Sequence, residues 1–120
     1  MYSYTRKYYM KKQYRINKKS DFEKLFEAKK IYFSRFLIVK SVPNDLAYPR
    51  FGMIISTKVS KRAVDRNKIR RRIREIFHLH FNEIKPGVDI LAIAKSSMLK
   101  LTYKETESEV LKGLKYLHLT

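Results

Sequence analysis

The stretch VDILAIA at residues 88–94 limits how this chain can fold more than any other feature. It is almost continuously apolar, which is typical of a strand buried on both faces of a sheet. Seven residues are far fewer than the roughly 20 needed to cross a bilayer, so a membrane span is not indicated. The chain has 120 residues and fits one compact domain. A small sheet covered by helices is therefore expected.

Helical and strand patterns alternate along the rest of the chain. Residues 20–28 predict a short helix, with Ser20 as N-cap, Glu23 completing a capping box, and Phe22, Leu25 and Phe26 on one face. The other predicted elements are a strand or bent strand pair at 31–42, a strand at 50–56, a long helix at 62–84, the strand at 88–94, a loop at 95–101 and a last helix opened by Thr102 and Glu105. The order α-β-β(-β)-α-β-α predicts a single α+β domain with a mixed sheet packed by helices.

The first 13 residues form a basic extension rich in tyrosine and lysine, ahead of a domain at 14–120. We expect this extension to be flexible, because blocks of like charge are usually solvated. A second interpretation stays open, in which Tyr8, Tyr9 or Tyr14 stacks on unpaired bases.

The net charge is unusually high for a small domain. Twenty-eight Lys and Arg residues against eleven Asp and Glu give a formal charge of +17. Self-repulsion of this size opposes compaction, so a polyanionic partner, either nucleic acid or an anionic membrane, is indicated. The chain has no cysteine, which excludes disulfides and thiolate metal sites. No hydrophobic signal segment is recognised, and we expect a cytoplasmic protein.

The predicted helix at 62–84 carries both an apolar stripe and a dense set of bases. On a helical wheel the isoleucines and phenylalanines share one arc with His80, and that arc must face the sheet. Between Arg66 and Arg74 there are six bases and no acid. Like charges four residues apart destabilise a helix, so a purely solvated face is disfavoured against a phosphate-binding surface. Arginine predominates there, and only Asn67 suits base reading, so backbone and shape recognition of folded RNA is favoured over sequence-specific DNA binding.

Residues 50–77, RFGMIISTKVSKRAVDRNKIRRRIREIF, resemble the signature region of the bacterial ribonuclease P protein subunit. That signature is a strand with an early glycine, a basic connection and a motif Arg-Asn-Arg-(Ile/Val)-Lys-Arg-x-x-Arg-(Glu/Gln)-x-Phe. The matching positions here are Arg66, Asn67, Lys68, Ile69, Arg70, Arg71, Arg74, Glu75 and Phe77. Lys68 and Arg70 interchange the commonest arginine and lysine, which keeps the charge but changes the donor geometry. The segment DFEKLF at 21–26 is also similar to the family, and the resemblance covers roughly residues 14–117.

The resemblance implies an α+β domain with a left-handed βαβ crossover. It also implies an RNA-binding subunit of the endoribonuclease ribonuclease P, which assists Mg²⁺-dependent removal of the 5′ leader from precursor tRNA. The chemistry is expected on the catalytic RNA, with Mg²⁺ at the RNA, no cofactor on the protein, and neither a membrane nor an obligate protein partner. The sequence agrees in offering no obvious catalytic residue and no metal-ligand spacing, since its acidic residues are scattered and His78 and His80 point in different directions.

Two binding surfaces are implied for the family's two RNA partners, the catalytic RNA and precursor tRNA. The residues expected to bind the catalytic RNA are Lys58, Lys61, Arg62, Arg66, Asn67, Lys68, Arg70, Arg71 and Arg74. Phe22, Phe26 and Phe36 match aromatic positions of a cleft that receives the leader, although core packing is an equally good interpretation of Phe22 and Phe36. A ribosomal or general structured-RNA-binding protein is the alternative function. A membrane-surface protein and an autonomous nuclease are less favoured.

Overall fold

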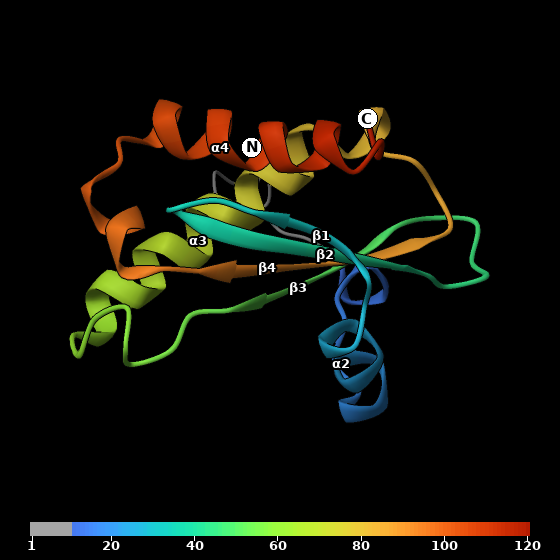
Figure 1. Cartoon of the computed structure of the whole chain (residues 1–120), viewed down its shortest axis with the longest axis horizontal. Helices are drawn as coiled ribbons and strands as arrows, with labels where there is room; N and C mark the ends of the chain where they lie inside the picture. Colours follow the sequence, from blue (N-terminus) through green and yellow to red (C-terminus); the bar gives the residue numbers. More distant parts are fainter. Residues whose placement is uncertain (1–10) are drawn as a thin grey trace, which may run out of the picture.

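The structure is a computed structural model, and it describes residues 11–120. Its elements in chain order are the 3-10 helix η1 (Lys12–Tyr14), α2 (Lys19–Phe26), β1 (Lys30–Phe33), β2 (Leu37–Pro43), β3 (Arg50–Ile54), α3 (Ala63–Leu79), η2 (Phe81–Glu83), β4 (Val88–Ala94), η3 (Ser96–Lys100) and α4 (Tyr103–Tyr116). The predicted order is confirmed, with the first strand region split into β1 and β2 (Figure 1). The interpretation of Tyr8 and Tyr9 as a stacking arm lies outside the described residues.

The sheet has four strands in the order β1-β2-β4-β3 and is mixed, as predicted. β1 pairs with β2, and β2 with β4, in antiparallel fashion, whereas β3 and β4 are parallel. β4 is thus an inner strand, and its side chains are buried on both faces, which explains its continuous apolar sequence. β3, α3 and β4 form the βαβ unit that the family resemblance implies. The left-handed sense of that unit stays a prediction.

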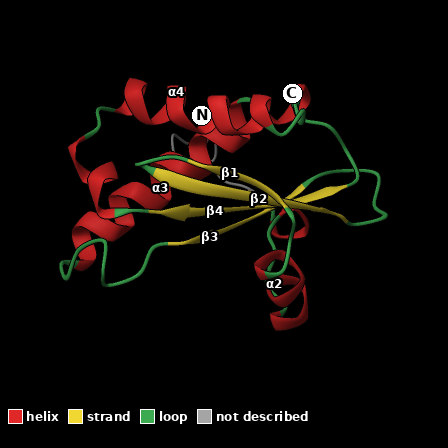
Figure 2. Cartoon of the chain, viewed as in Figure 1, coloured by secondary structure: helices red, strands yellow, loops and turns green. Residues whose placement is uncertain are grey.

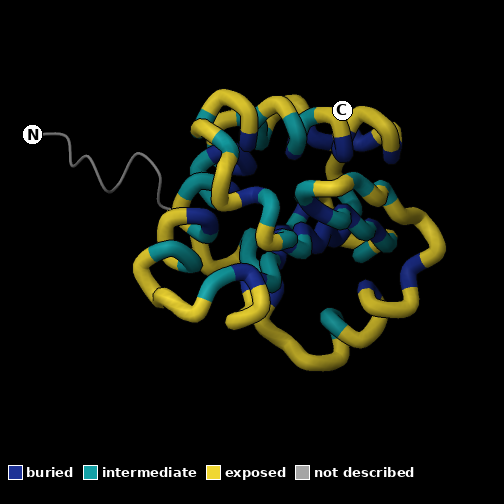
Figure 3. Tube along the Cα trace, turned by 60° about the vertical axis from the view of Figure 1, so that its left-hand side comes forward, coloured by how far each residue is buried: buried dark blue, intermediate teal, exposed yellow. Residues whose placement is uncertain are grey.

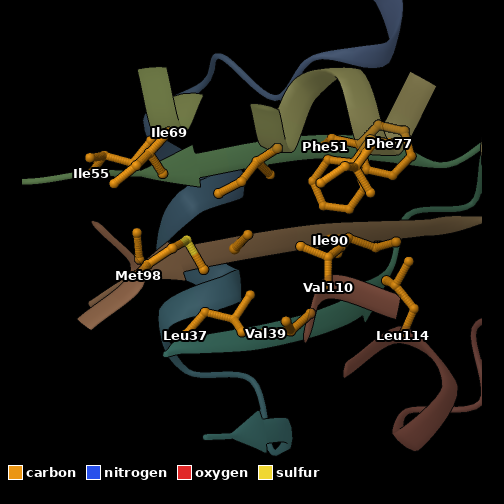
Figure 4. Close-up of a cluster of buried hydrophobic side chains, with 14 of the residues drawn as sticks. Leu37, Val39, Phe51, Ile55, Ile69, Phe77, Ile90, Met98, Val110 and Leu114 are labelled. Atoms are coloured by element: carbon orange, nitrogen blue, oxygen red, sulfur yellow. The ribbon is translucent and has the colours of Figure 1, made fainter. Parts of the chain in front are cut away.

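Helices lie on both sides of this sheet. Figure 2 shows α4 on one side and α2 on the other. The main core lies between the sheet and the pair α3 and α4, where Leu37, Val39, Ile90 and Ala92 meet the apolar stripes of both helices (Figure 4). A smaller cluster on the other face joins Leu25 of α2 to Leu91, with Ile16 beside them. Figure 3 shows the buried residues gathered inside and the exposed ones along the loops and the outer sides of the helices.

The apolar stripe of α3 packs as the wheel predicts. Ile69, Ile73, Ile76 and Phe77 are buried, and the Phe77 ring stacks on that of Phe51 with centroids 4.3 Å apart. Each such fully buried side chain stabilises the fold by roughly 1.5–3 kcal/mol. The free energy gained by this packing exceeds the few tenths of a kcal/mol that each like-charge pair on the other faces of α3 costs.

Two predicted helix boundaries are wrong. Ser20 is not an N-cap, because α2 begins at Lys19 after the extended Lys18, whose carbonyl accepts the amides of Asp21 and Phe22. The long helix ends at Leu79, earlier than predicted, and is followed by the separate turn η2.

The capping box at the start of α4 is confirmed. The Thr102 side chain accepts the Glu105 amide at 3.1 Å, and the Glu105 carboxylate accepts the Thr102 amide at 2.9 Å. Within residues 11–120, none of the helices combines the length and the apolar character required to cross a membrane.

Candidate nucleic-acid interface

The basic side chains of α3 fall into two groups. One group, Arg66, Arg70 and Arg74, lies on the side of the helix near Arg15, and we call it the basic flank. Arg66, Arg70 and Arg74 recur every four residues on one flank, and all three are partly buried. Lys68 and Arg71 are exposed. Arg72 serves the fold instead, because its guanidinium donates to the Leu101 carbonyl at 3.1 Å. The predicted RNA-binding set omitted Arg72, and this contact gives it a structural role.

The connection before α3 holds Arg66 in place. The Arg66 Nη1 donates to the Ser60 carbonyl at 2.8 Å, so its head is fixed at the margin of the domain. The Ser60 hydroxyl donates to Asp65 at 2.9 Å and accepts the Arg62 amide at 3.1 Å. These bonds order the start of the helix without a capping side chain at Arg62. Lys58, Lys61 and Arg62 are exposed around this point, which brings the predicted basic connection and helix start together.

Asn67 orients a neighbouring arginine. Its Oδ1 accepts from the Arg70 Nη1 at 2.9 Å, one helical turn further along. Asn67 is itself exposed. The amide therefore holds the guanidinium fork in one position, which reduces the entropy lost when the fork grips a phosphate.

Arg15 belongs to the same basic flank and was missed by the sequence analysis. It forms an isolated parallel bridge with Phe51 beside the edge strand β3, which places it near Arg74. Burial, and then the charges of Arg15 and Arg70, lower the pKa of Arg74. Within the described residues the buried Arg74 Nε has no hydrogen-bond partner. No local pattern marks Arg15, because its partners come from distant parts of the chain.

This concentration of charge favours an anionic ligand. Burial first, and then the nearby charges of Arg15 and Arg70, destabilise the charged form of Arg74, and together they lower its pKa. A phosphate placed among them would remove the repulsion and accept charge-assisted hydrogen bonds. The arrangement is thus more than a solvated charged face.

A buried ion-pair network ties α2 to the sheet. Arg50 donates to both carboxylate oxygens of Asp89, at 2.8 and 2.7 Å, and also lies 3.4 Å from the Asp21 carboxylate of α2. Asn44 donates to Asp89 at 2.9 Å. The pKa of Arg50 is raised, first by its hydrogen bond to Asp89, with burial opposing and the Asp21 charge adding to the effect. The network holds the first turn of α2 at the start of β3.

The sheet face on the α2 side carries an apolar row that the helix leaves open. Phe33, Ile38, Ile93 and Ile54 are register partners across all four strands, so their side chains lie on one face. Ile38, Ile93 and Ile54 are partly exposed, and Phe33 is 70% exposed. We call these four residues the open row. Its length across four strands is about 14 Å at the usual strand spacing.

Two lysines border the open row. Lys95 Nζ lies 3.7 Å from the centroid of the Phe33 ring and donates to the Ser34 carbonyl. Lys40 Nζ donates to the carbonyl of Phe26 at 2.8 Å and so links β2 to the end of α2. Aromatic and apolar surface with cations at its margin is the arrangement that suits unpaired nucleotides.

The three predicted cleft phenylalanines are not all together. The Phe22 and Phe26 rings lie 6.5 Å apart on α2. Phe22 packs on the small cluster and against Gly52, where a Cβ would lie 3.0 Å from the ring. Phe26 is 49% exposed and available to a ligand. Phe36 instead packs against the main core on the opposite side of the sheet. Its assignment to the leader cleft stays a prediction, while its position favours the core interpretation.

The described residues do not build a metal centre. They contain no group of three or more His, Cys, Asp or Glu side chains able to hold an ion. His80 lies at the core edge, where its two ring nitrogens contact Glu83 at 3.1 Å and Glu107 at 2.9 Å. These contacts join the end of α3 to α4, which is a structural role.

Comparison with known proteins identifies the family of this chain. The family model described as Ribonuclease P matches residues 10–118. The ribonuclease P protein component of Clostridioides difficile is 36% identical over 79% of this chain and 83% of its own length. That of Alkaliphilus oremlandii is 33% identical over 92% and 96%.

Solved structures of the same kind share the fold. A Staphylococcus aureus RNase P protein mutant with defective mRNA degradation activity superposes with a TM-score of 0.85, at 31% identity, over 91% of this chain and 92% of its own. The RNase P protein of Thermotoga maritima gives a TM-score of 0.74 at 25% identity, over 82% and 92%. The chain belongs to the bacterial ribonuclease P protein component family.

Proposed function

We propose that this chain, as the protein subunit of ribonuclease P, binds the catalytic RNA with the basic flank of α3 and the 5′ leader of precursor tRNA with the open row. Family membership supplies the reaction, which is endonucleolytic maturation of the tRNA 5′ end. The observation that carries the assignment of the first surface is the cluster of Arg15 and Arg70 around the partly buried Arg74, whose charge an RNA phosphate would stabilise. Arg66 and Asn67 extend this surface to the helix start.

The open row is supported as the leader site by its chemistry. A single strand exposes base faces that stack on apolar and aromatic groups, and each stacked base contributes roughly 1–3 kcal/mol. Phe33 and Phe26 offer exposed rings, and Lys95 and Lys40 provide positive charge beside the row. α2, held by the Asp21 contact, forms one wall.

We also propose that the chemistry and its Mg²⁺ belong to the catalytic RNA. The described side chains do not fit a metal site of their own, and no step is therefore assigned to a metal held by the protein. The proposed role of the chain is to bind the catalytic RNA and precursor tRNA and to hold them in position. Neutralising phosphates with arginine would lower the Mg²⁺ concentration that the RNA needs to bind its substrate.

Reconstitution with the organism's catalytic RNA tests the proposal. The protein should raise precursor-tRNA cleavage at low Mg²⁺, and log K for assembly should fall with log salt at a slope near −5 if about six phosphates are neutralised. Arg66→Ala should weaken assembly, whereas Lys104→Ala, an exposed lysine in the first turn of α4, should leave it unchanged. Phe26→Ala should lower affinity for precursor tRNA about tenfold and leave affinity for mature tRNA unchanged.

The alternative, a general structured-RNA-binding protein, predicts a different competition result. Unrelated folded RNAs would then displace the catalytic RNA at equal concentration. Equal competition, or a protein without effect on cleavage at any Mg²⁺ concentration, contradicts the proposal.

A further inference from the structure

A second basic and aromatic surface lies away from α3, at the outer edge of the sheet. A hollow of about 630 Å³ is lined by Lys29, Lys30, Ile31, Lys115, Tyr116, Leu117 and His118. We call it the β1-edge pocket. Three lysines and a histidine line it, and its lining contains no acidic residue.

Close helix packing creates this pocket. Gly113 lets α4 approach the sheet so tightly that a Cβ there would lie 2.9 Å from both Tyr32 and Val39. One turn later the Tyr116 ring rests against that of Tyr32, with centroids 5.4 Å apart and planes tilted by 54°. Tyr116 nevertheless remains 65% exposed. The Tyr116 ring is therefore held in position by Tyr32 and is still accessible to an RNA base.

The charge is not explained by helix stability alone. A cation in the last turn of α4 favours the negative end of the helix dipole, which accounts for Lys115. Lys29 and Lys30 come from a different part of the chain, at the start of β1, and line the pocket beside the same helix end, where the dipole favours them only weakly. Bringing these like charges together around an exposed aromatic ring opposes folding, unless an anion binds between them.

The pocket continues from the open row. β1 is an edge strand, and Ile31, which lines the pocket, pairs in register with Lys40 and so projects on the α2 face. Lys30 and Tyr32, the alternate residues of β1, project toward α4. The pocket thus wraps around the strand edge from one face to the other. A single strand that crosses the open row toward Phe33 arrives at this edge.

We propose that the β1-edge pocket binds single-stranded RNA, namely the part of a long 5′ leader that extends past the open row, with one base stacked on Tyr116 and phosphates contacting Lys29, Lys30 and Lys115. This inference rests on the proposed leader function. It predicts that the protein distinguishes substrates by leader length through residues distant from α3.

Binding of precursor tRNA to the reconstituted holoenzyme tests this, with leaders of about 4 and about 16 nucleotides, the range of single-strand site sizes. Tyr116→Ala should weaken binding of the long-leader substrate about tenfold and leave the short-leader substrate within about twofold. Tyr116→Phe should bind both substrates like the wild type, because the ring is kept. Combining Lys29→Ala, Lys30→Ala and Lys115→Ala should reduce the salt slope for the long leader by about two.

Lys104→Ala is the matched control, since it removes an exposed lysine from the other end of α4. Thermal unfolding of each variant separates loss of binding from loss of fold. Equal effects on both leaders, or none on the long leader, overturn the inference. A different result would contradict the proposed leader site itself, namely that Phe26→Ala leaves the affinity for the short-leader substrate unchanged.

Discussion

Removing the Asp89 carboxylate tests whether the Arg50 network fixes the position of α2. Asp89 is only 3% exposed and accepts three hydrogen bonds, two from Arg50 and one from Asn44. Asp89→Ala leaves the Arg50 guanidinium, whose side chain is 19% exposed, without its main partner. Breaking a buried pair in this way costs about 3–5 kcal/mol. For a chain of this size we expect a melting temperature lower by about 12–20 °C.

Asp21→Ala is the informative comparison. Its contact with Arg50 is longer, at 3.4 Å, and Arg50 keeps both bonds to Asp89 when it is lost. The expected cost is about 1 kcal/mol, close to that of an exposed ion pair. Because this contact joins α2 to β3, the variant should still lose leader affinity through displacement of Phe26, while assembly with the catalytic RNA stays intact.

Urea unfolding of the free protein measures the two free energies, and holoenzyme binding of precursor and mature tRNA measures the functional effect. Asp89→Asn should fall between the two variants, since the amide oxygen still accepts one bond from Arg50. The reasoning is refuted if Asp21→Ala destabilises as much as Asp89→Ala, or if Asp89→Ala costs less than about 1 kcal/mol.

Two further predictions concern the packing of α4. Burial lowers the pKa of His80, but hydrogen bonds to Glu107 and Glu83 outweigh it, and the net pKa is raised. The contacts of charged His80 with the two glutamates therefore stabilise the fold fully below the unfolded pKa of about 6.5, and this stabilisation is lost as pH rises through the folded pKa. His80→Ala should accordingly lower the melting temperature more at about pH 5 than at about pH 8. Gly113→Ala gains up to about 1 kcal/mol of helix propensity but forces a Cβ to within 2.9 Å of Tyr32, a clash that costs about 1–3 kcal/mol. Net destabilisation in thermal unfolding is expected, and a more stable variant would contradict the close packing.

Local and periodic signals in the sequence were sufficient for much of the fold. The isoleucine stripe from Ile69 to Ile76 predicted the buried face of α3, and the Thr102–Glu105 pair predicted the start of α4. Both signals act within one or two helical turns. Ser20 carried the same local signal, but Lys18 is the last extended residue and α2 already begins at Lys19, so Ser20 lies inside the helix.

The features that were missed depend on contacts between distant residues. Arg15 joins the basic flank only because its backbone pairs with Phe51. Phe36 matches an aromatic position of the family, but it lies in the connection between β1 and β2 and packs against the main core, which fits the core interpretation left open for it. A sequence pattern indicates that a residue is aromatic, whereas the path of the connecting segment decides which side of the sheet its ring contacts.

The N-terminal segment joins the two proposed RNA surfaces physically. Tyr14 packs against Phe81 on the main-core side, and Ile16 lies in the cluster under α2. Arg15 stands between them beside the basic flank, and the Ile16 amide donates to the Phe51 carbonyl at 2.8 Å. A phosphate bound at Arg15 therefore acts on a segment that also supports α2 and its exposed Phe26. Because Arg15 and Ile16 are adjacent in this segment, a phosphate that holds Arg15 would also restrain the side of the domain that supports α2. If the two proposed surfaces are correct, assembly with the catalytic RNA would therefore favour leader binding as well.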